Sequence, residues 1–446
     1  MIDNSLQSNV PMFEKLFGGS AIIGRVITSL FYLGIIGIML LEVSHYFVGT
    51  HGDESYYVDY TKAIGDNGIY KEVANGNPVG YTAIVYALSK LGLSLLLTGR
   101  FLTLISTFAF YLSLKYIGRN IFNLSGAYLQ LALLTCLLGV LGSHFYFIFC
   151  PDMFYYVIIM WIIVLMWRIV NKWAGWQIFA LVGTLISVTI LIRPLSLIFF
   201  MAFLLALFFI SFFTKVGIWR KASVFISFIA AFIIIFLFQQ YPSLHKSGGF
   251  AFENKINDPN TKATWEQRRI LTTLKKEKGE KTDGNFYVSW KQCDNYLKQY
   301  GPNSLPKGAT QVLFWSPTFF IKHFIFGLID VLRGFLRDTG FVFIFPFIFL
   351  FRPSFAGYKK FAFFTVISLV YIAIYLFITL DSVEIRHILI PMVISALAGI
   401  AILKNLMDEG KKYAVTFLNL QMAALFLILL LDIKFFVSAF LSFKMM

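Results

Sequence analysis

Long apolar stretches separated by short polar connections run along most of the chain. A helix needs about 20 largely apolar residues to cross the hydrocarbon core of a bilayer. The segments that reach or approach this length are 21–41, 101–117, 126–143, 153–170, 176–192, 195–213, 222–239, 340–351, 361–380, 388–403 and 415–432. The pattern therefore predicts an all-α integral membrane protein, a polytopic bundle of about 11 transmembrane helices in which 340–351 is the shortest.

Composition supports a membrane protein and excludes several other classes. Of the 446 residues, 58% are hydrophobic and 14% are charged, whereas soluble proteins have roughly 45–50% apolar and about 25% charged residues. In a membrane protein, a net charge of +15 is explained by basic residues that set the orientation of the spans. We therefore expect no nucleic-acid partner. Cys136, Cys150 and Cys293 form no CxxC or Cys/His cluster, so neither a disulfide framework nor a cysteine metal site is expected. The N-terminus lacks the pattern of a cleaved signal peptide.

Basic residues fall in every second short connection, which indicates the orientation of the chain. Short loops rich in Lys and Arg face the cytoplasm. The basic residues of these connections are Lys15, Arg25, Lys115, Arg119, Arg168, Lys172, Lys215, Arg220, Lys221, Arg352, Lys359, Lys360, Lys404, Lys411 and Lys412. The intervening short connections carry Arg193 and Arg386. We therefore predict a multi-pass protein of the cytoplasmic (inner) membrane with a cytoplasmic N-terminus, whose intervening loops face the periplasm or exterior.

Two of the predicted outer segments, 42–100 and roughly 240–340, are long enough to hold structure of their own. Within them, 78–97 and 314–338 mix apolar and charged positions and predict helices lying in the membrane interface. The predicted organisation is an N-terminal transmembrane module with an outer loop, an extracytoplasmic loop with an interfacial helix, and C-terminal transmembrane helices, at residues 1–239, 240–340 and 341–446.

Acidic residues are nearly absent from the predicted spans and gather just beyond their outer ends. Asp53 and Glu54 lie in the first outer loop, Asp152 precedes the fourth span, and Asp381 and Glu384 precede the tenth. A single loop acid is usually no more than solvated, but three clusters on one predicted face suggest a common site. Acids at the membrane surface suit a substrate whose polar head lies outside while its tail lies in lipid.

Short motifs in the predicted outer connections follow one another in a recognisable order. Their residues are Asp53, Glu54, Tyr57, Ala63, Asn77, Pro78, Gly92, Gly99, Arg100, Asp152, Met153, Arg193, Pro194, Glu384, Arg386, His387 and Pro391. In this order the chain resembles the polytopic glycosyltransferases of the GT-C fold, in particular the branch that includes the protein O-mannosyltransferases and the lipid A aminoarabinose transferases. The resemblance extends over about residues 20–400. The chain departs from the branch at Asn77-Pro78-Val79, where two prolines are usual.

The resemblance implies a sugar donor linked to polyprenyl phosphate and an acceptor that attacks the anomeric carbon with inversion. The acceptor hydroxyl must lose its proton to a nearby carboxylate, and Asp53 is the candidate general base. Glu54 and Asp152 are further catalytic candidates, which would orient the acceptor or stabilise the cationic sugar. A divalent cation such as Mg or Mn, held by Asp53 and Asp152, stays open because members of the branch differ in metal use. Candidates to bind the donor phosphate are Arg100, Arg193, Arg386 and His387.

The aromatic residues that flank Asp152 have two interpretations. They are typical of an interfacial aromatic belt, and as a second role they could stack on a sugar ring or line an isoprenoid groove. They are Phe145, Tyr146, Phe147, Phe149, Phe154, Tyr155 and Tyr156. Arg100 likewise has a plain interpretation as a helix-end anchor at the lipid headgroups.

Two other classes of membrane protein compete with a glycosyltransferase. An envelope polysaccharide polymerase or ligase acting on lipid-linked glycans would use outer Arg and His without an Asp-Glu pair, so Asp53 and Glu54 discriminate against it. A polytopic transporter predicts ionisable residues inside the spans, and the spans between 126 and 239 contain no acid. The acceptor stays open as a protein, a lipid or a glycan, and the polar, basic stretch 245–307 is the candidate for its recognition. The expected setting is a bacterial cell envelope, with membrane lipids around the protein.

Overall fold

The computed structural model describes residues 22–46, 53–172, 175–250, 263–283, 287–379 and 383–444. Within these ranges every regular element is a helix, and no strand is present. The described residues form two compact units. Unit 1 comprises those within 1–252, 335–371 and 385–446, and unit 2 comprises those within 253–334 and 372–384.

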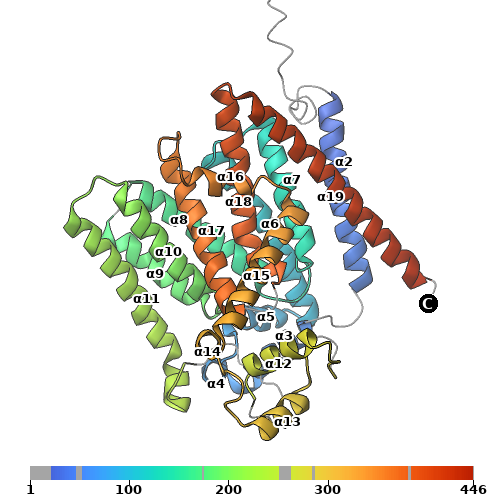
Figure 1. The fold of residues 1–446 in the computed structure, drawn as a ribbon, viewed down its shortest axis with the longest axis vertical. Coiled ribbons are helices and arrows are strands. Elements are labelled where there is room, and N and C mark those ends of the chain that lie inside the picture. Colours follow the sequence, from blue (N-terminus) through green and yellow to red (C-terminus); the bar gives the residue numbers. More distant parts are fainter. Residues whose placement is uncertain are drawn as a thin grey trace, which may run out of the picture. The chain divides into compact units, whose positions relative to one another are not determined.

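Most of the helices belong to unit 1 (Figure 1). They are α2 (Ile22–Tyr46), α3 (Glu54–Asn67), α4 (Ile69–Ala74), α5 (Val79–Ser89), α6 (Leu95–Asn120), α7 (Gly126–Ser143), α8 (Asp152–Lys172), α9 (Trp176–Thr189), α10 (Ser196–Phe212), α11 (Ile218–Ser247), α16 (Ile344–Phe349), α18 (Ile385–Asp408) and α19 (Lys412–Lys444). Unit 2 contains α12 (Trp265–Glu277), α13 (Trp290–Tyr300) and α14 (Ala309–Trp315). The boundary between the units falls inside α15 (Pro317–Thr339) and α17 (Tyr358–Thr379).

Seven of the described helices are long and apolar enough to cross a membrane, so the protein is an all-α, multi-pass membrane protein. Their apolar stretches are Leu95–Asn120, Gly126–Ser143, Asp152–Asn171, Ile218–Lys246, Tyr358–Thr379, Ile385–Asp408 and Lys412–Lys434. Three further predicted spans also fold as apolar helices. The first is α2, which has 25 residues and contains the apolar stretch Thr28–Val43, and the other two are the shorter helices α9 and α10.

Helix α18 lies in the core of unit 1, where it packs against α7, α8, α16 and α19. Eighteen of its residues are buried, on all sides of the helix, which is typical of a helix in the centre of a bundle. At the edge of the unit, α2 and α19 lie side by side although they stand at opposite ends of the sequence (Figure 1). Phe31 of α2 and Phe426 of α19 meet edge to face with ring centroids 4.4 Å apart.

The predicted span 340–351 does not fold as one membrane-spanning helix. Its only described helix is α16, with six residues, which is about 9 Å long against a hydrocarbon core of about 30 Å. Gly340 has a φ of 70°, which ends α15, and the following residues form turns. The apolar side chains Phe345 and Phe349 are buried instead inside the protein.

The chain nevertheless passes from one end of unit 1 to the other between Thr339 and Tyr358. Thr339 packs beside Gly139, near the C-terminal end of α7. Lys359 and Lys360 donate hydrogen bonds to carbonyls at the C-terminal ends of α8 and α6, which is the opposite end of the bundle. Irregular backbone at membrane depth is tolerated where it is buried in protein.

The buried amide of Gln421 in α19 supplies hydrogen bonds to the start of this broken segment. It accepts from the Phe341 N–H at 3.2 Å and donates to the Thr339 carbonyl at 2.8 Å. Its side chain is fully buried. One polar side chain thus satisfies backbone groups that the interruption of the helix exposes.

The predicted interfacial helix over 78–97 is shorter in the structure and is split in two. Helix α5 ends at Ser89, and Gly92 adopts a φ of 102° that a helix does not accommodate. Helix α6 then begins at Leu95, after Ser94 caps it by accepting a hydrogen bond from the Leu97 N–H. Residues 95–97 therefore belong to the helix of the second predicted span, and Arg100 lies inside this helix rather than ahead of it.

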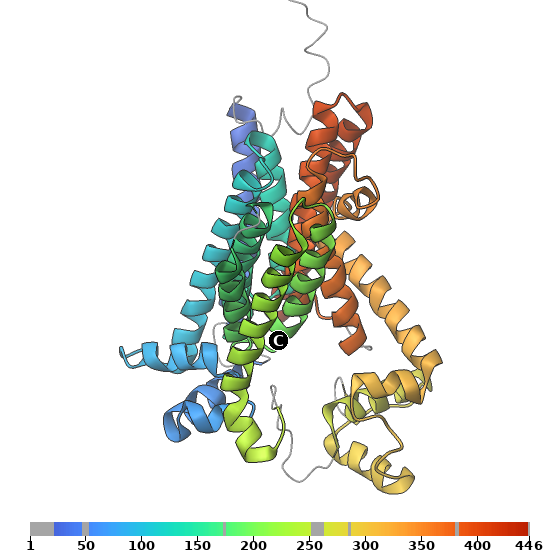
Figure 2. The same cartoon turned by 90° about the vertical axis from the view of Figure 1, so that its left-hand side faces the viewer.

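Unit 2 has its own small core beneath α12 and α13, the yellow helices of Figure 2. Thr264 and Gln267 form a capping box at the start of α12. The buried core residues are Ile270, Leu271, Val288, Cys293, Leu297, Leu305 and Val312. The predicted interfacial helix over 314–338 corresponds to α15, which begins at Pro317. It leaves Ile321, Ile325 and Phe326 exposed.

Candidate functional site

The predicted outer connections of unit 1 meet at one end of its helices. The start of α3 supplies Asp53, the second turn of α6 supplies Arg100, and the start of α8 supplies Asp152. Arg193 comes from the turn between α9 and α10, and Arg386 from the first turn of α18. Three carboxylates and three arginines pair with one another here. We call this set the charge network, and it consists of Asp53, Glu54, Arg100, Asp152, Arg193 and Arg386.

The first pair of the charge network is buried and bidentate. Arg100 donates from Nε to Glu54 Oε1 at 2.8 Å and from Nη2 to Oε2 at 2.7 Å. The Phe149 N–H also donates to Oε1, at 2.8 Å. The Glu54 side chain is 0% exposed and that of Arg100 is 8% exposed. Glu54 therefore joins α3, α6 and the loop 144–151 through charge-assisted hydrogen bonds.

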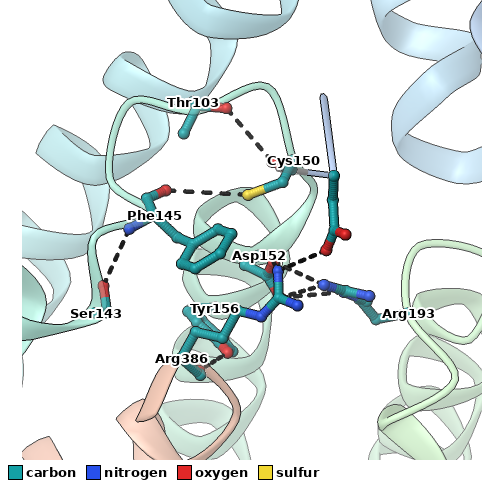
Figure 3. Close-up of polar contacts among 9 residues, drawn as sticks. Thr103, Ser143, Phe145, Cys150, Asp152, Tyr156, Arg193 and Arg386 are labelled. Atoms are coloured by element: carbon teal, nitrogen blue, oxygen red, sulfur yellow. Dashed lines mark hydrogen bonds and ion pairs between the residues drawn. The ribbon is translucent and has the colours of Figure 1, made fainter. Parts of the chain in front are cut away.

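A glycine allows this loop to approach α6 closely. A Cβ at position 99 would lie 2.3 Å from the Phe149 ring, so the ring fits there only because residue 99 is glycine. Thr103, one turn further along α6, donates to the Cys150 carbonyl at 3.4 Å (Figure 3). The Tyr81 hydroxyl donates to the Gly99 carbonyl at 2.9 Å. The approach at Gly99 and the Thr103 hydrogen bond hold the loop where its backbone N–H reaches Glu54, and the Tyr81 hydrogen bond joins α5 to α6.

The second pair fixes the start of α8 to the turn between α9 and α10. Arg193 donates from Nη2 to both Asp152 oxygens at 2.7 Å and from Nε to Oδ1 at 3.1 Å. The Asp152 side chain is 0% exposed and that of Arg193 is 5% exposed. The Gly80 N–H donates to the Leu191 carbonyl at 2.8 Å, which ties α5 to the same turn. Asp152 is thus a buried carboxylate with a strong partner.

The third pair lies between Asp53 and Arg386 and is the more accessible one. Arg386 Nη1 donates to Asp53 Oδ2 at 2.8 Å and lies 3.9 Å from Asp152 Oδ2. Its guanidinium lies over the Phe145 ring at 4.1 Å from the centroid, and its carbonyl accepts a hydrogen bond from Tyr156. Figure 3 shows Arg193 and Arg386 reaching Asp152 from different parts of the chain. The Asp53 side chain is 23% exposed.

The remaining predicted site residues lie around this network or outside it. His387 is close enough to Asp152 to interact with its charge, and its carbonyl accepts from the Tyr371 hydroxyl at 2.7 Å. Glu384 is exposed and belongs to unit 2. Asp381 lies outside the described residues.

The interpretation of the aromatic residues around Asp152 as an interfacial belt is wrong for most of them. Tyr146, Phe147, Phe149, Tyr155 and Tyr156 are at most 3% exposed. They pack inside unit 1. Tyr146, Phe147 and Phe149 belong to the loop 144–151, which folds back onto α3 and α6, and Tyr155 and Tyr156 lie near the start of α8. Buried rings of this kind exclude water and strengthen the electrostatic interactions of the charge network.

The arrangement of the carboxylates does not fit a divalent cation. Asp53 and Asp152 both face the guanidinium of Arg386, which would repel a metal ion placed between them. Among the described residues, no group of three or more His, Cys, Asp or Glu side chains could hold a metal. We therefore derive no step of the chemistry through a metal ion.

Glu42 is a buried acid that the sequence analysis did not single out. It lies near the end of α2 and is 3% exposed. It accepts hydrogen bonds from the Tyr146 hydroxyl and meets His144 Nδ1 at 2.6 Å. This hydrogen bond raises the pKa of His144 above its ordinary value. An acid within one turn of the predicted end of an apolar span is the signal that could have identified it.

No protein-family model matches the chain, and no curated protein matches it.

Proposed function

We infer that the protein is a membrane glycosyltransferase of the GT-C type. It would move a sugar from a polyprenyl-phosphate donor to an acceptor, with inversion, on the extracytoplasmic side of a bacterial cytoplasmic membrane. The observation that carries this proposal is the pairing of a partly exposed carboxylate, Asp53, with a buried arginine, Arg386, at the end of the helices where the predicted outer loops meet. This transfer requires a base that accepts the proton of the acceptor hydroxyl and a cationic group that binds the donor phosphate.

The proposed topology follows the basic connections of the sequence. In this topology the short helices α9 and α10 each cross the membrane, as the fifth and sixth of about 11 crossings. The broken segment around α16 makes the eighth. The charge network then faces the periplasm or exterior. A donor with its isoprenoid tail in the bilayer would present its sugar and phosphate at this level.

In the proposed reaction, the acceptor hydroxyl oxygen forms a bond to the anomeric carbon of the sugar. Its proton passes to the Asp53 carboxylate. The bond between the anomeric carbon and the phosphate oxygen breaks, and its electron pair stays on that oxygen. Arg386, with His387 beside it, meets the negative charge that develops on the phosphate. Polyprenyl phosphate is the leaving group.

The two fully buried pairs have a different role in this proposal. Glu54 and Asp152 have side chains that are 0% exposed and bonded to Arg100 and Arg193. A carboxylate held in this way is a poor proton acceptor for a substrate hydroxyl. We assign these four as positioning residues, which hold the loop 144–151 and the turn after α9 around Asp53.

The test is transfer of labelled sugar from a polyprenyl-phosphate-linked pool by the purified protein in lipid. Asp53→Asn keeps the side-chain shape and removes the base, so turnover is expected to fall about 100-fold or more. Asp59→Asn is the matched control, because Asp59 lies on the same helix with a side chain that is 74% exposed. It should retain wild-type turnover.

Other outcomes would change the proposal. If both variants transfer at the wild-type rate, Asp53 is not the base and the proposed mechanism is wrong. If the wild-type protein consumes no polyprenyl-phosphate sugar, the glycosyltransferase proposal fails, and a polymerase of lipid-linked glycans or a transporter becomes the better hypothesis. The acceptor class would then be sought among proteins, lipids and glycans separately.

A further inference from the structure

The formal charges of the charge network cancel before any substrate binds. Each of its arginines has a carboxylate partner, in the pairs Arg100–Glu54, Arg193–Asp152 and Arg386–Asp53. A polyprenyl-phosphate-linked sugar carries a negative phosphodiester, which requires a positively charged partner in a site shielded from water. One arginine must therefore exchange its carboxylate for the phosphate.

Burial identifies the pair that can open. Glu54 and Asp152 have side chains that are 0% exposed, and removing the partner of a buried charge is strongly unfavourable. The Asp53 side chain is 23% exposed, so water and the acceptor hydroxyl can solvate its carboxylate after Arg386 leaves it. The Asp53–Arg386 pair is therefore the one that costs least to separate.

The surroundings of Arg386 are suited to such an exchange. Asp152 keeps two 2.7 Å hydrogen bonds from Arg193, so a movement of Arg386 does not leave that buried carboxylate uncompensated. The Phe145 ring lies 4.1 Å from the Arg386 guanidinium. A cation over an aromatic face is attracted to the ring, which keeps the guanidinium at the site while its anionic partner changes.

We propose that the donor phosphate takes the place of Asp53 on Arg386, and that this exchange frees the Asp53 carboxylate to act as the base. The inference rests on the proposed function and adds regulation of the same site. Without donor, a guanidinium neutralises the base and occupies one of its oxygens. With donor bound, the carboxylate can accept the acceptor proton, so donor binds first and the base is active only when a donor is present.

The exchange predicts that removing the base strengthens binding of the phosphate. The probe is a polyprenyl phosphate titrated into the purified full-length protein in phosphatidylcholine nanodiscs, with the uncharged polyprenol as the matched ligand. In Asp53→Asn the competing carboxylate is gone, and we expect the phosphate to bind about three- to tenfold more tightly. Binding of the polyprenol should not change. Asp59→Asn removes the same formal charge from an exposed position of α3 and should leave both affinities unchanged.

Arg386 variants test whether the tighter phosphate binding of Asp53→Asn depends on this arginine. Adding Arg386→Gln to Asp53→Asn should abolish the tighter binding, whereas Arg386→Lys should retain part of it because the charge remains. Thermal stability of each variant is measured alongside, so that a loss of folding is recognised. If the gain persists in the Asp53→Asn, Arg386→Gln variant, the phosphate does not bind at Arg386 and the exchange is refuted.

The remaining outcomes separate this inference from the proposed function. If the wild-type protein transfers sugar but Asp53→Asn binds the phosphate no more tightly, the exchange is wrong and the glycosyltransferase stands. If the wild-type protein neither binds polyprenyl phosphate nor transfers sugar, both are wrong. A second series contains phosphatidylglycerol. If this lipid competes away the gain, Arg386 binds a general lipid phosphate, and its assignment to the donor is overturned.

Discussion

Removing Arg100 should destabilise the protein strongly, because the change leaves the buried Glu54 carboxylate without its cationic partner. In Arg100→Met, Glu54 loses its hydrogen bonds at 2.8 Å and 2.7 Å from the guanidinium. It keeps the one from the Phe149 N–H, and its side chain has no exposed surface through which water could replace the lost bonds. Breaking a buried ion pair in this way costs about 3–5 kcal/mol of the free energy of unfolding.

The assay is the free energy of unfolding of the purified protein in mixed micelles, titrated with a denaturing detergent. Lys62→Met is the matched control on α3, because it breaks the Asp59–Lys62 pair, whose side chains are 74% and 62% exposed and 3.9 Å apart. An exposed pair contributes at most about 1 kcal/mol. Arg100→Met should therefore lose several times as much stability as Lys62→Met.

A double-mutant cycle isolates the pair itself. Glu54→Gln removes the stranded charge, so adding it to Arg100→Met should cost less than the sum of the two single changes, with a coupling of about 0.5–3 kcal/mol. The reasoning is refuted if Arg100→Met is no more destabilising than Lys62→Met, or if the two single changes are additive. Either result would mean that Glu54 is solvated or protonated in the folded protein.

Two further predictions concern a titrating group and a strained turn. The Glu42 hydrogen bond raises the pKa of His144. Its contribution to stability is therefore complete below the unfolded pKa of about 6.5 and is lost as the pH rises through the higher folded pKa. The pH dependence of the unfolding temperature above pH 6.5 should flatten in His144→Gln, and an unchanged profile would contradict this assignment. Gly340→Ala should cost about 1–3 kcal/mol of unfolding free energy, because φ is 70° there and a Cβ would lie 2.4 Å from Gln421 Oε1. The comparison is Gly410→Ala, which has a φ of 77° but open space around the Cβ. It should cost less, and equal losses would mean that the Gln421 contact is unimportant.

Local hydrophobicity was sufficient to predict most of the helices. The predicted spans 126–143, 153–170 and 388–403 lie within α7, α8 and α18, because a stretch of apolar residues becomes helical in a bilayer whatever its neighbours are. The predicted connections before the fourth, sixth and tenth spans carry Asp152, Arg193 and Arg386. Alternation of the spans places such connections at the same end of a bundle, and in the structure these three residues meet there.

Only the tertiary structure decided how those charges pair and which of them are buried. Asp53 and Arg386 are 333 positions apart in the sequence, and no local pattern indicates that Arg386 takes Asp53 while Arg193 takes Asp152. The same holds for the broken segment after Gly340, where apolar composition predicted a span and the buried amide of Gln421 stabilises an interruption. Hydrophobicity and helix formation are properties of neighbouring residues. Burial, ion pairing and the satisfaction of a broken backbone depend on side chains that approach only after the helices have packed.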